Sequence, residues 1–381
     1  MTTQPFEVEF TTEAIADLRR RLEHTRWPAE VSNSGWDLGT NLTYLQELCG
    51  YWQTGFDFAG QAAYLNQMPQ FTTTVDGYGI HYVHAEGAGP NPLPLVFTHG
   101  WPGTFFEIHK ILELLTNPAA HGGDVADSFT VVVPSLPGYG YSEIPTTTGW
   151  GQARTAELWD GLMQQLGYQR YGAQGGDWGA VVTAHLGHSF PERVVGSQIN
   201  MPFLGPIGDR TPQTDDEREY LKRAGQWQAA EAAYQAIQRT KPQTLAYGLT
   251  DSPSGLAGWI TEKLSSWSDS NGAVETRFTK DEMLTNISIY WFTNTINSST
   301  RYYYESGADP ANRLTHEIEV PVGISIFPGE IGGLSAPRSW VERGTANLTQ
   351  WSEHDRGGHF AAMEEPELLA QDIRDFFRPL R

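Results

Sequence analysis

The sequence predicts an α/β fold with a mostly parallel sheet that helices cover on both faces. Two observations carry this prediction. Between residues 71 and 201, short apolar stretches typical of buried strands alternate with segments of helical periodicity. The alternation stops after residue 201 and resumes near the C-terminus, so the sheet should contain an insertion. At 381 residues, the chain can form one large core with an insertion, or two domains.

Residues 1–70 precede the expected sheet and are rich in helical and aromatic sequence. We expect helices at 12–23 and 41–52. The first twenty residues contain several acidic side chains and no long apolar run. We therefore expect neither a signal peptide nor a membrane anchor.

Residues 71–201 should form the first part of the core. Asp76-Gly77 suits a tight turn with positive φ, so we expect a hairpin of strands 71–75 and 80–84. Further strands are expected at 93–98, 129–133, 168–174 and 194–199, with helices at 105–115, 155–166 and 180–187.

Residues 202–305 are aromatic, polar and largely helical, and we expect them to form a lid inserted into the core. A Thr-x-x-Glu capping box at 214–217 predicts the start of a helix. Residues 306–381 return to the core, with a strand at 320–327 and an amphipathic helix that begins at Pro366.

Residues 175–179, Gly-Gly-Asp-Trp-Gly, have the pattern of a nucleophile elbow, with Asp177 where a serine usually lies. In an elbow, a strained turn from strand to helix exposes the central side chain, and small neighbours make the turn sterically allowed. The expected strand 168–174, helix 180–187 and strand 194–199 give the order found in the α/β-hydrolase fold.

A carboxylate at the centre of an elbow predicts a particular class of reaction. Asp177 would attack carbon and form an alkyl ester on the enzyme. The substrate must then carry a strained ring or a good leaving group on an sp3 carbon. Epoxides and alkyl halides both meet this requirement.

Hydrolysis of such an ester requires a base, which a second residue should orient. His359 precedes the final helix, where a loop histidine can reach the elbow, and His354 is the nearby rival. Glu330 follows the strand at 320–327 and is the expected orienting acid. Asp355 is its competitor, but it is too close along the chain to hold His359 from the expected side.

The oxyanion hole is expected at residues 99–103, His-Gly-Trp-Pro-Gly, which end a strand and begin a helix. In the α/β-hydrolase fold, one amide of this loop and one amide directly after the nucleophile stabilise the oxyanion. We assign these roles to the backbone N–H groups of Trp101 and Trp178.

Composition excludes several other functions. The net charge of −20 argues against nucleic acid and anionic membrane surfaces as partners. Cys49 is the single cysteine, so the chain has no internal disulfide framework, which fits a reducing cytoplasm. His354 and His359 do not match the helical zinc motif. We expect no metal and no cofactor.

Five motifs together resemble the microsomal-type branch of the epoxide hydrolases, and the resemblance covers nearly the whole chain. It implies that residues 1–70 form an N-terminal meander across the core and the lid. The matching motifs are Arg-Trp-Pro at 26–28, Asp-Leu-Gly at 37–39, His-Gly-Trp-Pro-Gly at 99–103, Ser-Leu-Pro-Gly-Tyr-Gly at 135–140 and Gly-Asp-Trp-Gly at 176–179.

The resemblance also implies residues that the spacing alone does not identify. Glu330 matches the use of glutamate as the orienting acid in this branch. Two lid tyrosines should hydrogen-bond the epoxide oxygen, and Tyr234 and Tyr303 lie in segments that look like the family's. Tyr302 and Tyr304 flank Tyr303, so either neighbour could hold its place.

The main hypothesis is hydrolysis of an epoxide to a vicinal diol through an Asp177 ester, followed by attack of water activated by His359. The alternatives are a haloalkane-type dehalogenase, in which Trp101 and Trp178 would cradle a halide, and a noncatalytic binding protein. The aromatic lid favours a bulky apolar group on the substrate, and the expected partners are a small-molecule, apolar, aromatic epoxide and water. The reaction would serve detoxification or biosynthesis. We expect a cytoplasmic protein, which could form a homodimer.

Overall fold

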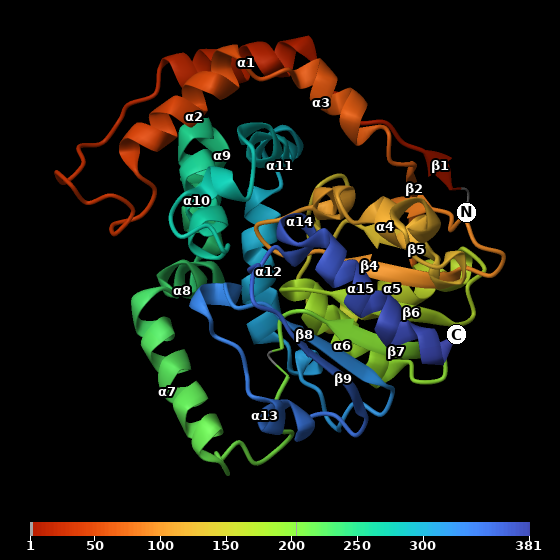
Figure 1. Ribbon diagram of the computed structural model, residues 1–381. Coiled ribbons are helices and arrows are strands. Elements are labelled where there is room, and N and C mark those ends of the chain that lie inside the picture. The colour runs from red at the N-terminus through yellow and green to blue at the C-terminus, as the bar shows by residue number, and fades with distance from the viewer. Residues whose placement is uncertain (1–2, 203) are drawn as a thin grey trace.

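The computed structural model describes residues 3–202 and 204–381, which form one nine-stranded sheet with helices on both faces (Figure 1). Pairing is antiparallel from β1 to β5 and parallel across the rest of the sheet, which confirms the mostly parallel α/β prediction. In spatial order the strands are β1 (Gln4–Pro5), β2 (Gln70–Val75), β3 (Tyr78–Ala85), β5 (Phe129–Pro134), β4 (Leu93–Thr98), β6 (Tyr171–Gly175), β7 (Val194–Ile199), β8 (Val322–Ile326) and β9 (Leu348–Glu353).

Two pairs of helices cover the sheet. Helices α5 (Gln152–Gln165) and α6 (Trp178–Ser189) pack together on one face, and α4 (Leu112–Thr116) and α15 (Pro366–Phe377) pack on the other. Neighbouring residues of β7 face opposite ways, as the period of a strand requires. Gly196 lies against Phe376 of α15, whereas the Ser197 side chain is directed to α6 and bonds to the Thr183 carbonyl.

The helix expected at 105–115 is two separate pieces. A 3-10 helix, η1 (Phe105–His109), comes first and α4 follows it. The His109 Nδ1 atom lies 2.8 Å from the Phe106 carbonyl oxygen, which in a continuous α-helix would accept from the amide of Lys110. This side-chain contact accompanies the break, and the resulting turn places Glu107 beside the loop that follows β4.

Helices occupy the chain between β7 and β8 and lie over one end of the sheet (Figure 1). The structure thus has a helical insertion where the sequence predicts a lid. These helices are α7 (Asp215–Ala230), α8 (Ala233–Thr240), α9 (Pro242–Asp251), α10 (Pro253–Ser266), α11 (Lys280–Thr293) and α12 (Ile296–Ala308).

The N-terminal helices arch over this helical insertion at the top of Figure 1. Trp52 donates from its indole N–H to Ser288 of α11 at 3.0 Å, and Arg21 pairs with Asp251 at 2.7 Å. Residues far apart in the sequence are therefore joined across this surface. The N-terminal helices are α1 (Thr12–Glu23), α2 (Leu42–Thr54) and α3 (Phe58–Leu65).

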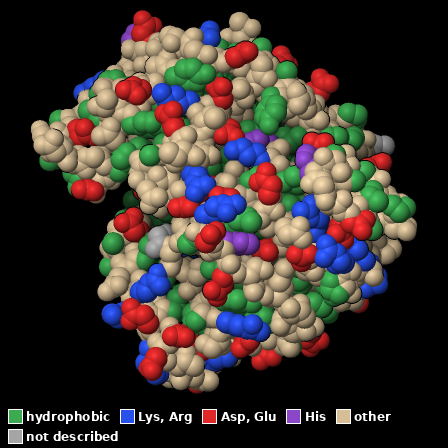
Figure 2. Space-filling view, in the orientation of Figure 1, with side chains coloured by type: hydrophobic (Ala, Val, Ile, Leu, Met, Phe, Trp, Pro, Cys, Tyr) green, Lys and Arg blue, Asp and Glu red, His purple; other side chains and the backbone are tan. Residues whose placement is uncertain are grey.

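Short elements complete the chain. The remaining helices are α13 (Arg338–Glu342), α14 (Ala361–Glu364) and the 3-10 helices η2 (Pro118–His121), η3 (Val125–Asp127), η4 (Val274–Thr276), η5 (Pro310–Asn312), η6 (Glu330–Gly332) and η7 (Arg378–Leu380). Among the described residues, no helix is both long and apolar enough to span a membrane. Acidic and basic side chains are interspersed on the face shown in Figure 2.

Candidate active site

The elbow lies between β6 and α6, and its geometry explains the glycines. Asp177 has φ 50° and ψ −126°, a conformation that L-residues rarely adopt. A Cβ atom on Gly179 would overlap the carbonyl oxygen of Thr98, and one on Gly175 would lie against the backbone of Gly179 and Ala180. The glycines thus allow the backbone to approach itself closely enough to present Asp177 above the end of β6.

Both predicted oxyanion donors contact the Asp177 carboxylate. The Trp101 amide donates to Asp177 Oδ1 at 2.8 Å. The Trp178 amide also bonds to this carboxylate and stabilises its charged form. A negative charge that developed on Oδ1 would therefore meet two preorganised donors.

His359 lies between Asp177 and Glu330. Its Nε2 atom is 3.6 Å from Asp177 Oδ2, and its Nδ1 atom is 2.6 Å from Glu330 Oε1. A hydrogen bond from Nδ1–H to Glu330 leaves the Nε2 atom facing the elbow. The backbone of His359 is held as well, because its amide donates to the Trp267 carbonyl at 2.9 Å.

The two alternative residues that the sequence offered, His354 and Asp355, have other environments. His354 Nε2 is 2.7 Å from Asp372 Oδ2, and its ring stacks on Phe327. The side chain of Asp355 is 90% exposed. The structure therefore brings His359 and Glu330 to Asp177 and gives His354 a partner on α15.

Burial and charge act in opposite directions on the two central groups. Burial lowers the pKa of His359, but the negative charges of Glu330, Asp177 and Glu107 outweigh that effect and raise it to about 9. Burial raises the pKa of the Asp177 carboxyl, although His359 and the two amides oppose the increase. Near neutral pH, we interpret the resting pair as a carboxylate beside an imidazolium.

Tyr234 of α8 and Tyr303 of α12 lie together over this site. Their ring centroids are 6.0 Å apart, and the two rings meet edge to face. The Tyr234 ring stacks on Trp101 at 5.5 Å, and the Tyr303 ring packs edge-on against Trp178 at 4.7 Å. Both tyrosines thus contact the residues that carry the oxyanion amides.

The neighbours of Tyr303 point to other environments. The Tyr302 hydroxyl lies 2.9 Å from Thr155 Oγ1, so it already has a partner on α5. Tyr304 is 43% exposed. Within the tyrosine run, Tyr303 is the residue that lies beside Tyr234.

Sequence reasoning missed one titratable side chain near the site. Glu107 of η1 interacts electrostatically with both Asp177 and His359. The available signal was weak, because it consists of one acidic residue within the apolar stretch Phe-Phe-Glu-Ile at 105–108. Among the described residues, no group of three or more His, Cys, Asp or Glu side chains is arranged to hold a metal ion.

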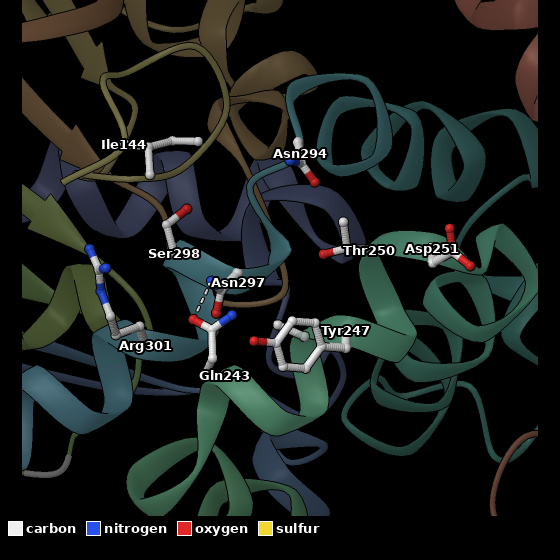
Figure 3. A pocket seen from close by; sticks show the side chains of 10 residues that line it. Ile144, Gln243, Tyr247, Thr250, Asp251, Asn294, Asn297, Ser298 and Arg301 are labelled. Atoms are coloured by element: carbon white, nitrogen blue, oxygen red, sulfur yellow. Dashed lines mark hydrogen bonds between the residues drawn. The ribbon is translucent and has the colours of Figure 1, made fainter. Parts of the chain in front are cut away.

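A separate cavity of about 420 Å³ lies between α9 and α12 (Figure 3). Gln243 and Asn297 both line it, and the Asn297 amide donates to Gln243 Oε1 at 3.1 Å. Tyr247 and Arg301 also line it, whereas Asp177 and His359 do not. This cavity is therefore distinct from the site around the elbow.

Comparison with known proteins places these residues in a family context. Residues 3–108 match the family model for the epoxide hydrolase N terminus, and residues 94–201 match that of the α/β hydrolase fold. The chain is 45% identical to a Stigmatella aurantiaca protein whose name provisionally assigns it to the epoxide hydrolases. That alignment covers 99% of this chain and 85% of the relative.

Two further relatives extend the comparison. The chain is 38% identical to epoxide hydrolase 1 of Sus scrofa, over 98% of this chain and 88% of that protein. The crystal structure of juvenile hormone epoxide hydrolase from the silkworm Bombyx mori superposes with a TM-score of 0.90 at 29% identity. The superposition covers 100% of this chain and 95% of the silkworm chain.

Proposed function

This chain belongs to the epoxide hydrolases of the α/β-hydrolase fold, and we propose that it forms a diol through a covalent ester of Asp177. Family membership sets aside the dehalogenase and the noncatalytic binding protein as alternatives. The observation that carries the proposed mechanism is the position of the Asp177 carboxylate. One oxygen is held by the Trp101 amide, and the other faces His359.

In the first step, Asp177 Oδ2 attacks a ring carbon of the epoxide. Oδ1 accepts from the Trp101 amide, so Oδ2 is the oxygen that can form the new bond. The carbon–oxygen bond of the ring breaks, and its electron pair stays on the epoxide oxygen. The product of this step is an ester whose carbonyl oxygen, Oδ1, remains in the oxyanion hole.

Tyr234 and Tyr303 are the proposed acids for that step. An alkoxide is a poor leaving group near neutral pH, so ring opening requires a proton donor as the charge develops. Burial raises the pKa of Tyr234 and of Tyr303, and the nearby Asp177 carboxylate raises both further, so each phenol keeps its proton in the resting site. One phenol gives its proton to the alkoxide and regains a proton from the imidazolium of His359, directly or through water.

In the second step, neutral His359 takes a proton from water through Nε2. The water oxygen attacks the carbonyl carbon of the ester, which is Cγ of Asp177. The amides of Trp101 and Trp178 stabilise the negative charge that develops on Oδ1. When the intermediate collapses, the bond between that carbon and Oδ2 breaks. The diol leaves with Oδ2 and the proton from His359. The second proton of the water then passes from the new Asp177 carboxylic acid to His359, which restores the carboxylate and the imidazolium.

Aromatic side chains around the site support an apolar, aromatic epoxide as the substrate. Trp101 lies within 6.1 Å, centroid to centroid, of the rings of Tyr234, Trp267 and Tyr303. Such rings favour flat apolar groups by stacking and edge contacts. A cytoplasmic location, a homodimer, and the choice between detoxification and biosynthesis stay predictions.

The variant His359→Gln tests the mechanism, because it removes the base without removing the nucleophile. Ester formation should continue and ester hydrolysis should slow by at least about 100-fold. Intact-protein mass spectrometry after mixing with styrene oxide should then show a stable adduct of one substrate mass. An epoxide remains intact if Asp177 does not attack it, so Asp177→Asn is the matched variant that should give no adduct. Near-normal turnover of His359→Gln without an adduct would contradict the proposal.

A further inference from the structure

Lys263 is a buried basic residue that the two proposed steps do not use. It lies in the last turn of α10 and is 4% exposed, and its ammonium group pairs with Glu262 at 2.5 Å. A charge this far from water is stable only beside groups that compensate for its lost hydration. The other groups around the ammonium therefore indicate what its charge acts on.

The Lys263 ammonium lies over the ring of Tyr234. The nitrogen is 4.4 Å from the centroid of that ring and 5.4 Å from the centroid of the Trp267 ring. A cation within about 6 Å of an aromatic centroid is attracted to the negative face of the ring, and the attraction is stronger where water is excluded. Tyr234 is buried as well, so this contact lies in a dry environment.

Tyr234 connects this cation with the reacting groups. Its ring is parallel to that of Trp101, whose amide holds Asp177 Oδ1, and it meets the Tyr303 ring edge to face. Within the described residues, no basic side chain lies over the ring of Tyr303 in the same way. The two phenols that we assign as acids thus have different electrostatic surroundings.

We propose that Lys263 stabilises the negative charge that develops on Tyr234 as this phenol protonates the epoxide oxygen. The proton leaves the Tyr234 hydroxyl while Asp177 Oδ2 bonds to the ring carbon and the carbon–oxygen bond of the epoxide breaks. The phenolate then takes a proton from the His359 imidazolium, so Lys263 neither gains nor loses one. The ammonium attracts a phenolate more strongly than a neutral phenol, and an interaction that strengthens in the transition state speeds the step.

This inference rests on the proposed function and concerns its first step alone. It makes Tyr234 the principal acid and Tyr303 the secondary one. Burial raises the pKa of both phenols, but Tyr303 opposes that increase at Tyr234, whereas Tyr234 adds to it at Tyr303. The phenol beneath the cation is therefore also the one that its neighbour helps to lose a proton.

Lys263→Met tests the charge, because it keeps the length of the side chain and removes the ammonium. Ester formation should slow by about 10-fold, the size expected for a desolvated contact between a cation and a ring. Lys263→Arg keeps a cation and should stay within about threefold of the parent. Rapid quenching and mass spectrometry of the intact protein measure the rate, with His359→Gln present in every variant so that the ester accumulates.

The effect of Lys263 should depend on the Tyr234 hydroxyl. In Tyr234→Phe, the further change Lys263→Met should alter ester formation by less than about twofold, because Tyr303 is then the donor. In Tyr303→Phe, the same change should slow ester formation by about 10-fold or more, because Tyr234 is the remaining acid. Equal effects of Lys263→Met in the two backgrounds would overturn the inference.

Ester decay separates this electrostatic role from a role in packing. The Trp267 carbonyl holds the His359 amide at 2.9 Å, so a lysine that only supported Trp267 would also support ester hydrolysis. With His359 in place, Lys263→Met should change the decay of the alkyl-enzyme by less than about threefold. Parallel losses of ester formation and ester decay would overturn the inference.

Lys280→Met is the matched control. Lys280 also belongs to the helical insertion and pairs with a glutamate, Glu275, at 3.5 Å, but among the described lysines only Lys263 lies over an aromatic ring. Lys280→Met should change either rate by less than about twofold. A loss of ester formation as large as that of Lys263→Met would mean that the contact with Tyr234 is not the cause.

A second variant applies if Lys263→Met does not fold. Lys263→Gln is polar and uncharged, and the same results are expected of it. If His359→Gln forms no ester, or if the double change of Tyr234 and Tyr303 to Phe leaves ester formation at the parental rate, the proposed function fails. If both behave as expected while the neutral Lys263 variant forms the ester at the parental rate, only the present inference fails.

Discussion

The His359 imidazole lies among three carboxyl groups, and their charges determine when it can act as a base. Its pKa is raised to about 9 in the resting site, so it is mostly protonated near neutral pH. In the proposed mechanism, esterification would remove the charge of Asp177 and lower the pKa of His359. The ester would then help to produce the neutral imidazole that its own hydrolysis requires.

Glu330→Gln should change both the rate and the pH dependence of ester hydrolysis. The rate should fall by about 10- to 100-fold, because the amide orients His359 less well than the carboxylate at 2.6 Å does. Loss of the Glu330 charge lowers the pKa of His359, so the neutral base persists to lower pH. The rising limb of the profile should move down by about one to three pH units, as followed by the decay of the alkyl-enzyme.

Asp355→Asn is the control for this prediction, because the exposed Asp355 carboxylate was the competing acid in the sequence. Asp355→Asn should leave the rising limb of the pH profile at the same pH. If the rising limb also keeps its pH in Glu330→Gln, a group other than Glu330 controls the pKa of His359.

The sequence predicted most of the candidate site residues because each belongs to a motif with a fixed position in the fold. Asp177 lies in an elbow, Trp101 follows a buried strand, and His359 precedes the last helix. Tyr303 could be selected from residues 302–304 only by knowing which face of α12 is turned to Asp177. No local pattern in the sequence gives that orientation. Glu107 was not identified, because its position depends on a 3-10 turn that the hydrophobic periodicity of the sequence did not predict.

The insertion contributes one tyrosine from each of two helices, α8 and α12. Tyr234→Phe and Tyr303→Phe should each slow ester formation by about 10- to 100-fold, because the remaining phenol can still donate. The double change should nearly abolish it. Stopped-flow quenching of tryptophan fluorescence measures the step, and Tyr304→Phe, at an exposed position on α12, should behave as the parent. Parental ester formation in the double variant would mean that the tyrosines serve only in packing.

The elbow tolerates no side chain at Gly179. In Gly179→Ala, the new methyl group would meet the Thr98 carbonyl, which is backbone and cannot rotate away. We expect destabilisation by about 1–3 kcal/mol or more, seen as a lower thermal midpoint. Gly225→Ala is the matched control, because Gly225 lies in α7 with open space around it. Alanine there should raise the free energy of unfolding by about 1 kcal/mol at most. Equal midpoints for the two variants would contradict the close packing described for the elbow.

Element prediction failed mainly where tertiary contacts override local pattern. The strand β9 was not located from the sequence, because only one neighbour pairs with it and its residues are polar or partly exposed. The closing helix was predicted from Pro366 because an apolar face and an N-terminal proline mark it directly.

Across the whole molecule, a charged cluster joins the helical insertion to the loop that carries His359. Arg277 pairs with Asp269 at 2.6 Å and with Glu365 at 2.8 Å. Asp269 also accepts from the Gly357 amide at 3.0 Å. The position of His359 therefore depends on contacts from a segment that lies about ninety residues earlier in the chain.

Arg277→Met should lower stability by about 1–3 kcal/mol, because it removes the basic partner of the partly buried Asp269 and leaves Glu365 with Arg356 alone. Thermal unfolding measures the change. Arg218→Met removes an exposed pair with Asp215 and should cost less than about 0.5 kcal/mol. An equal effect of both substitutions would mean that the Arg277 cluster behaves as an ordinary surface ion pair.

The covalent role of Asp177 is the central claim, and isotope labelling tests it most directly. With enzyme in excess over epoxide in heavy-oxygen water, the diol of the first turnover should carry an unlabelled oxygen from Asp177. Peptide mass spectrometry should then find the heavy oxygen in Asp177 itself. If the first diol carries the label and Asp177 does not, water attacks the epoxide directly and the ester mechanism is wrong.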